Sequence, residues 1–215
     1  MSSEAHRTWF PTLRETVAHV LEMSIPDNRV EALSKLVDFI QMKMEANQSV
    51  RLNFICTHNS RRSQLAQVWA HVAAAYYGLE VQCASGGTET TAFYPAAIAS
   101  LERAGCAIRK DSEVNPNVWV DFAQNVRPVH AYSKTYDQSY PQGETYAAIM
   151  TCSSADEGCP FIPQAEVRFA IRYDDPKAFD GSPQEAPAYD ERCLQIASEM
   201  FYVFSQIPPS PHVHA

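Results

Sequence analysis

Long apolar runs are missing from this sequence of 215 residues. None approaches the roughly 18 consecutive apolar residues that a membrane-spanning helix needs, so we expect no membrane partner. Residues 1–11 also lack the basic segment followed by an apolar stretch that is typical of a secretory signal peptide. We therefore expect a cytoplasmic protein.

Clusters of basic residues are scarce as well. Lys and Arg number 17 against 25 Asp and Glu, which gives a formal net charge of −8. A nucleic-acid surface needs clustered Lys and Arg to neutralise phosphates, and the Arg61-Arg62 pair alone is too small for that. We expect no nucleic-acid partner, although a local site can still bind a small anion.

Paired metal-ligand spacing is absent, because no Cys-x2-Cys occurs among the six cysteines. The pattern therefore predicts no metal site, and a disulfide framework is not expected in a reducing compartment. Cys193 shares a helix face with Ile196 and Met200, which predicts a core position. Cys83 and Cys106 have no activating charge nearby in the sequence.

Two stretches near the N-terminus repeat apolar residues at helical spacing, over residues 12–23 and 30–44. Between them lies Pro26, a residue that is tolerated at the start of a helix but not inside one. We read residues 1–48 as an N-terminal helical extension, whose apolar faces pack on the main domain or form a dimer contact.

Residues 49–207 are expected to form the main, catalytic domain, and residues 208–215 a flexible tail. Strands and helices alternate along this domain, which predicts an α/β fold with a parallel sheet and right-handed crossovers. The predicted strands are 50–55, 79–83, 146–151 and 167–173, and the predicted helices are 64–77, 94–104 and 188–204. Residues 115–140 are read as an insertion whose segments 118–122 and 126–132 pair as a β-hairpin.

The loop between the first strand and the next helix carries the strongest signal. It reads Cys56-Thr57-His58-Asn59-Ser60-Arg61-Arg62-Ser63. A loop that curls at this point directs backbone N–H groups inward and forms an anion-binding nest, and the helix start adds its positive end. Arg62 can hold two oxyanion oxygens with its planar fork. The same field favours the thiolate of Cys56, so we predict a nucleophile that attacks a tetrahedral oxyanion.

Such a nucleophile needs an acid that protonates the departing oxygen. Asp174-Asp175-Pro176 directly follows the fourth predicted strand. On its own this tripeptide is typical of a turn. Because the carboxyl ends of parallel strands share one edge of a sheet, we expect it to face the Cys56 loop and to supply the acid.

A second cysteine-bearing segment, Thr151 to Pro160, follows the third predicted strand on the same edge. It contains Cys152 and Cys159 with six residues between them. Two such thiols on a segment that can rearrange, as Gly158 permits, are suited to thiol-disulfide exchange. The alternative is that both are unrelated core cysteines.

These motifs resemble the low-molecular-weight protein tyrosine phosphatase superfamily, and especially its thioredoxin-coupled arsenate reductase branch, over roughly residues 50–206. The resemblance implies a four-stranded parallel sheet in the order 2-1-3-4 with helices on both faces. It also implies roles for individual residues: nucleophile, binding arginine and general acid for Cys56, Arg62 and Asp175, and loop braces for Asn59 and Ser63. Ser85-Gly86-Gly87 resembles the family's Ser-Ala-Gly turn after the second strand.

The implied function is the reduction of arsenate to arsenite through a Cys56, Cys152 and Cys159 relay. The implied ligand is arsenate or phosphate, with no bound cofactor and with thioredoxin or a similar external thiol as reductant; a nearby monovalent cation is implied by analogy alone. Two alternatives stay open. One is a phosphatase that hydrolyses phosphotyrosine through a cysteinyl-phosphate, and the other is an oxyanion-binding redox sensor without catalysis.

Two departures from the phosphatases favour the reductase. Arg61 stands where they carry a second loop cysteine, and Lys177-Ala178-Phe179 stands where they tend to place tyrosines. His58 occupies the family's usual glycine position, where a positive φ is tolerated poorly. Arg61 is expected either to lie in solvent or to pair with Asp156 or Glu157 of the redox segment.

Overall fold

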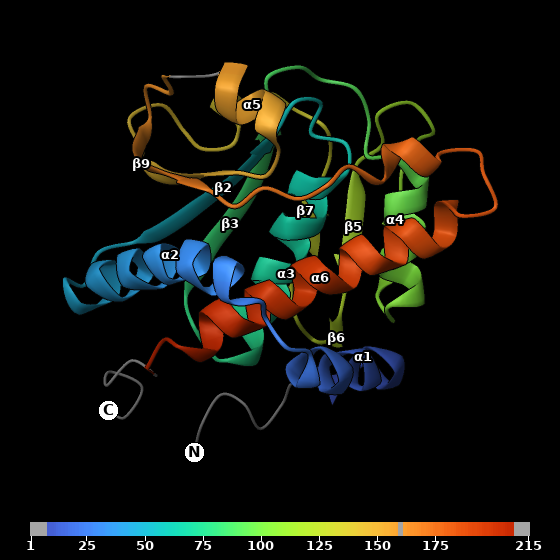
Figure 1. Cartoon of the computed structure of the whole chain (residues 1–215), viewed down its shortest axis with the longest axis horizontal. Coiled ribbons are helices and arrows are strands. Elements are labelled where there is room, and N and C mark those ends of the chain that lie inside the picture. Colours follow the sequence, from blue (N-terminus) through green and yellow to red (C-terminus); the bar gives the residue numbers. More distant parts are fainter. Residues whose placement is uncertain (1–7, 159–160, 209–215) are drawn as a thin grey trace.

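A computed structural model describes residues 8–158 and 161–208, and its centre is a four-stranded parallel sheet (Figure 1). The strands are β2 (Val50–Cys56), β3 (Val81–Gly87), β8 (Tyr146–Met150) and β9 (Ala165–Ala170). They lie in the order β3-β2-β8-β9, and every neighbouring pair is parallel. The predicted α/β class and the strand order 2-1-3-4 are confirmed.

The two central strands, β2 and β8, are buried on both faces, which explains their nearly continuous apolar sequences. On one face Leu52, Phe54 and Ile149 join the main core, formed with the helices α2 (Asp27–Glu45), α3 (Arg62–Tyr76) and α6 (Glu185–Ser205). Alternate residues of the same strands, among them Ile55 and Met150, enter a smaller second core on the opposite face.

The second face is covered by shorter pieces. These are the helix α5 (Ser153–Gly158) and the 3-10 helix η2 (Tyr136–Gln138). Tyr140 packs in this layer, and its hydroxyl shares its proton between the carbonyl oxygens of Leu52 (3.0 Å) and Gln82 (2.8 Å). In Figure 1, α5 lies near the upper end of β2 and α6 runs across the opposite side of the sheet.

Both N-terminal helices are present: α1 (Pro11–Glu22) and α2 pack against α6. Their apolar stripes, including Leu13 and Leu36, are completely buried in the main core. The Arg29 side chain of α2 pairs with Glu199 of α6 at 2.5 Å. The helices therefore share the core of the main domain, and the division of the chain at residue 48 remains a prediction.

The predicted hairpin within residues 115–140 is also present. Strand β5 (Val118–Asp121) pairs antiparallel with β7 (Val129–Ala131). Strand β4 (Ala107–Lys110) joins the other side of β5, and it was not predicted because its residues are mostly exposed and carry two basic side chains. A separate two-residue strand, β6 (Ala123–Gln124), pairs with β1 (Thr8–Trp9).

The junction between α4 (Pro95–Arg103) and β4 requires a glycine. Gly105 has φ = +99°, and a Cβ at this position would lie 2.3 Å from the backbone nitrogen of Leu13. A residue with a Cβ fits there only if the start of α1 shifts.

Within residues 8–158 and 161–208, none of the helices is long and apolar enough to span a bilayer.

Candidate functional site

Cys56 is the last residue of β2, and residues 57–61 connect it to α3. Its side chain is buried, with 3% of the residue exposed. The Cys56 Sγ lies 3.0 Å from the Ser63 Oγ, which also accepts a hydrogen bond of 2.9 Å from the Asn59 amide. Because that hydroxyl already accepts from Asn59, its own proton is available to the sulfur. The Ser63 hydroxyl is therefore placed to donate to the sulfur of Cys56.

The backbone between Cys56 and α3 carries free hydrogen-bond donors. The N–H groups of residues 57–63 have no acceptor within the described ranges 8–158 and 161–208. Seven consecutive N–H groups without an acceptor thus lie between Cys56 and the start of the 15-residue helix α3, an arrangement typical of anion-binding loops. Unpaired buried N–H groups are unfavourable unless a ligand or water accepts from them.

Asn59 holds the loop in shape. It has φ = +46°, and its Oδ1 accepts from the backbone N–H of Lys134 at 3.0 Å. Asparagine tolerates this left-handed conformation better than most residues. The strained position therefore falls on Asn59, so His58 does not have to replace a glycine at a positive φ.

Three other loop side chains point to neighbouring segments. The imidazole of His58 is 42% exposed and lies 3.5 Å from the Glu89 carboxylate. The Ser60 hydroxyl donates to the carbonyl oxygen of Ala92 at 2.6 Å. The Thr57 hydroxyl lies 3.6 Å from the sulfur of Cys152. These contacts leave the backbone N–H groups and Arg62 as the groups suited to hold an oxyanion.

The end of β3 supports the loop from the side. Ser85-Gly86-Gly87 pairs with residues 54–56 as strand, so the prediction of a turn there is wrong. A Cβ at Gly87 would lie 2.7 Å from the Thr57 carbonyl oxygen and 2.5 Å from that of Glu89. Glycine at this point lets β3 approach the loop closely enough for the Glu89 N–H to donate to Thr57.

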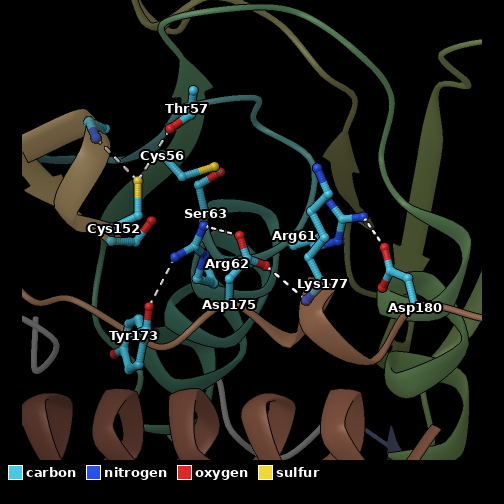
Figure 2. Close-up of polar contacts among 12 residues, drawn as sticks. Cys56, Thr57, Arg61, Arg62, Ser63, Cys152, Tyr173, Asp175, Lys177 and Asp180 are labelled. Carbon is cyan, nitrogen blue, oxygen red and sulfur yellow. Dashed lines mark hydrogen bonds and ion pairs between the residues drawn. The ribbon is translucent and has the colours of Figure 1, made fainter. Parts of the chain in front are cut away.

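Arg62, the first residue of α3, connects the loop to the segment after β9 (Figure 2). Its Nη1 donates to the carbonyl oxygen of Tyr173 at 3.0 Å, and its Nη2 forms an ion pair with Asp175. The Arg62 Nε is buried and has no hydrogen-bond acceptor in the described residues. The Nε–H therefore remains available for a ligand.

Asp175 is the carboxylate of the Asp-Asp-Pro motif that reaches the site. It caps the 3-10 helix η3 (Pro176–Phe179) by accepting from the Lys177 N–H at 3.1 Å. Asp174 is 99% exposed and lies 3.9 Å from Arg192, away from the loop. Burial and contacts thus distinguish two adjacent aspartates that have similar chemistry.

Arg61 differs most from its predicted surroundings. Its Nη2 contacts the Asp180 carboxylate at 2.7 Å, its Nε donates to the Tyr189 hydroxyl at 2.5 Å, and its guanidinium lies 3.9 Å from the ring centre of Tyr94. The expectation that it lies in solvent or pairs with Asp156 or Glu157 is wrong. Burial alone lowers the pKa of Arg61, but Tyr189 and Asp180 outweigh it and the pKa is raised.

Cys152 follows β8, the strand next to β2. The backbone N–H of Thr151 donates to the carbonyl of Ile55 at 2.7 Å, so Cys56 and Cys152 emerge from adjacent strand ends. The Cys152 sulfur is buried beside Thr57 and accepts from the Ala155 N–H at 3.4 Å. Cys159, the third predicted redox residue, lies outside the described residues.

Asp156 fixes α5 to the edge of the sheet. Its carboxylate accepts from Arg168 of β9 and from Arg172 beyond it. Burial raises the pKa of Asp156, but these guanidinium groups have the larger combined effect, and the pKa is lowered. The segment between Cys152 and residue 158 is therefore anchored by two ion pairs.

The remaining cysteines have the properties of inert thiols. Cys193 is buried in α6 and accepts from the Trp69 indole at 3.2 Å; burial raises its pKa to about 11. Burial also raises the pKa values of Cys83 and Cys106. In the part of the chain that the structure describes, no group of three His, Cys, Asp or Glu residues could hold a metal ion.

Asp180, Tyr189 and Tyr94 are site residues that the sequence did not indicate. They come from the end of η3, from α6 and from the residue before α4. Their side chains contact one another and surround the guanidinium of Arg61, an arrangement that depends on the packing of α4 and α6. No spacing of residues in the sequence indicates these contacts of Arg61.

The chain is similar in sequence to several arsenate reductases. No family model matches the chain. It is 26% identical to an arsenate reductase of Bacillus licheniformis over 155 residues, which is 71% of this chain and 93% of that protein. It is 29% identical to an arsenate reductase of Staphylococcus epidermidis over 123 residues, 57% of this chain and 76% of the relative.

Solved structures of similar fold include a low-molecular-weight phosphotyrosine phosphatase from Vibrio cholerae. It is 14% identical, with a TM-score of 0.49, and the match covers 73% of this chain and 95% of that one. An arsenate reductase in a phosphate-binding state gives a TM-score of 0.46 at 20% identity, over 74% of this chain and 99% of that one.

Proposed function

Since the chain belongs to the superfamily that unites low-molecular-weight protein tyrosine phosphatases with arsenate reductases, we propose that it reduces arsenate to arsenite. The observation that carries the proposal is the position of Cys152. Its sulfur lies beside Thr57 of the anion loop, at the end of the strand adjacent to that of Cys56. Hydrolysis of a phosphate ester transfers no electrons and needs no second thiol, whereas the reduction of arsenate does.

In the first step the oxyanion binds to the loop N–H groups and to Arg62. The Cys56 thiolate attacks arsenic, and Asp175 gives a proton to the departing oxygen, which leaves as water. The product is a Cys56 thioester of arsenic acid in which arsenic is still pentavalent. The unpaired N–H donors and the unpaired Arg62 Nε support this step, because they oppose the negative charge.

In the second step the Cys152 thiolate attacks the Cys56 sulfur. The sulfur–arsenic bond breaks with its electron pair on arsenic, which becomes trivalent and departs as arsenite, and a Cys56–Cys152 disulfide remains. Cys159 then attacks Cys152 and releases the Cys56 thiolate. An external dithiol such as thioredoxin reduces the resulting Cys152–Cys159 disulfide, so that one dithiol is oxidised for each arsenate reduced.

A phosphatase is the second candidate. Cys56, Arg62 and Asp175 alone are sufficient to hydrolyse a phosphate ester, and Phe179 at the end of η3 is 44% exposed. An aryl substrate could stack on that ring. A single aromatic side chain is a weak clamp, whereas the second thiol has a direct role in reduction. The reductase is therefore the better supported of the two.

The two candidates are distinguished by a coupled assay with thioredoxin, thioredoxin reductase and NADPH. We expect NADPH oxidation that depends on arsenate, together with slow hydrolysis of 4-nitrophenyl phosphate and no preference for a phosphotyrosine peptide. Rapid hydrolysis of the peptide without arsenate-dependent NADPH oxidation would identify the phosphatase. If neither activity is found but Cys152 and Cys159 oxidise reversibly, the protein is a redox sensor.

A further inference from the structure

Two adjacent arginines hold the two ends of one short helix. Arg62 binds Asp175, which precedes η3, and Arg61 binds Asp180, which follows it. Figure 2 shows the two guanidinium groups on diverging paths, Arg62 toward Asp175 and Tyr173, and Arg61 toward Asp180. The segment that carries the proposed general acid is therefore tied to the anion loop at two points.

Arg61 is held by contacts from three separate segments of the chain. The Tyr189 hydroxyl accepts from Arg61 and donates to the other oxygen of Asp180 at 2.7 Å. The ring of Tyr94 stacks on that of Tyr189 with centroids 5.6 Å apart, and its backbone N–H donates to Ser60 of the loop at 2.9 Å. The arginine side chain is 11% exposed, so solvent screens this cluster little.

The contacts of Arg62, by contrast, use N–H groups that can also bind an oxyanion. An arginine that binds an oxyanion through two parallel hydrogen bonds must direct two of its N–H groups to the ligand. Its Nη1 and Nη2 are engaged with Tyr173 and Asp175 in this structure. A bound oxyanion therefore competes with Asp175 for the same guanidinium, at the step where the acid has to stay close to the departing oxygen.

We propose that Arg61 is a positioning residue: its cluster with Asp180, Tyr189 and Tyr94 holds the Asp175 segment against the loop while Arg62 is occupied by the oxyanion. Arg62 thus binds the oxyanion, while Arg61 keeps the Asp175 segment in place. The inference rests on the proposed function only in assigning Asp175 as the acid, because the tie itself is independent of the substrate.

The first test measures the segment directly. Hydrogen exchange of the Asp180 and Ser182 amides, both hydrogen-bonded at the end of η3, is followed with and without saturating inorganic phosphate. With phosphate bound, exchange in Arg61→Ala should be roughly tenfold or more faster than in the wild type, the loss expected for a charge-assisted contact. The Arg62→Ala variant lacks the contact with Asp175 even without a ligand. In that background, and without phosphate, Arg61→Ala should therefore accelerate exchange by the same factor.

The matched control is Arg103→Ala, which removes another arginine–aspartate contact to α6, with Asp190, away from η3. It should leave exchange at Asp180 and Ser182 unchanged. Equal exchange in the wild type and Arg61→Ala, both with phosphate and in the Arg62→Ala background, would overturn the proposal. This readout requires no turnover, so the failure of arsenate reduction and the failure of the tie are separate results.

The second test uses leaving groups. Phenyl phosphate needs its departing oxygen protonated, whereas 4-nitrophenyl phosphate needs it far less. Arg61→Ala should lower kcat/KM for phenyl phosphate about 30-fold or more and for 4-nitrophenyl phosphate less than about threefold, with phosphate affinity unchanged. Arg61→Lys should restore part of the loss, and Arg61→Ala should add nothing in an Asp175→Asn background. Equal losses on both esters would mean a general structural defect.

Discussion

Replacing Cys56 with serine is expected to abolish arsenate reduction and aryl-phosphate hydrolysis together, by on the order of 10⁴-fold or more. A serine hydroxyl is not ionised near neutral pH and is a far weaker nucleophile than a thiolate. Both rates are measured on the same preparation. Inorganic phosphate should still bind, because Arg62 and the loop N–H groups are unchanged.

The matched control for this variant is Cys83→Ser. Cys83 is a partly buried thiol of β3 whose pKa is raised by burial, and it has no place in the proposed chemistry. Both activities of Cys83→Ser should stay within about twofold of the wild type. If Cys56→Ser kept more than a few per cent of the arsenate reduction, a different sulfur would have to be the nucleophile.

Replacing Cys152 with serine should separate the two activities. Arsenate turnover with thioredoxin should fall about 1,000-fold or more, because the thiol proposed to release arsenite from Cys56 is gone. Aryl-phosphate hydrolysis should stay within about threefold, since Cys56, Arg62 and Asp175 are untouched. The serine oxygen can still accept from the Ala155 N–H and meet Thr57, so the start of α5 should be preserved.

The opposite outcome has an equally clear meaning. Normal arsenate reduction by Cys152→Ser would show that an external thiol resolves the Cys56 adduct directly. Parallel loss of both activities would show that the substitution disturbs the anion loop, and phosphate binding measured by calorimetry detects that case independently. The Cys83→Ser variant serves as the control here as well.

Features that depend on neighbouring residues in the chain were predictable. The buried strand that ends at Cys56, the loop and the helix that starts at Arg62 follow one another directly, so hydrophobic pattern and loop chemistry agree. The sheet edge then followed from a general rule, because the carboxyl ends of parallel strands face the same way. That rule brought Asp175 and Cys152 to the site although they are far from Cys56 in the sequence.

Contacts that depend on how helices pack were not predictable. Arg61 could have reached several carboxylates, and its choice of Asp180 is decided by where α6 presents Tyr189. Asp156 similarly binds Arg168 of β9 and Arg172 beyond that strand, and the pairing of β9 with β8 brings this part of the chain beside α5. The positive φ at Asn59 reflects the closure of the loop against Lys134, a contact 75 positions along the chain.

A single turnover of the Cys159→Ser variant tests the central claim most directly. The reduced protein is mixed with excess arsenate without thioredoxin, and arsenite, free thiols and the disulfide are quantified. The relay predicts about one arsenite per protein, the loss of two thiols and a disulfide that joins Cys56 to Cys152. Arsenite release with Cys56 still reduced, or a disulfide that excludes Cys152, would contradict it.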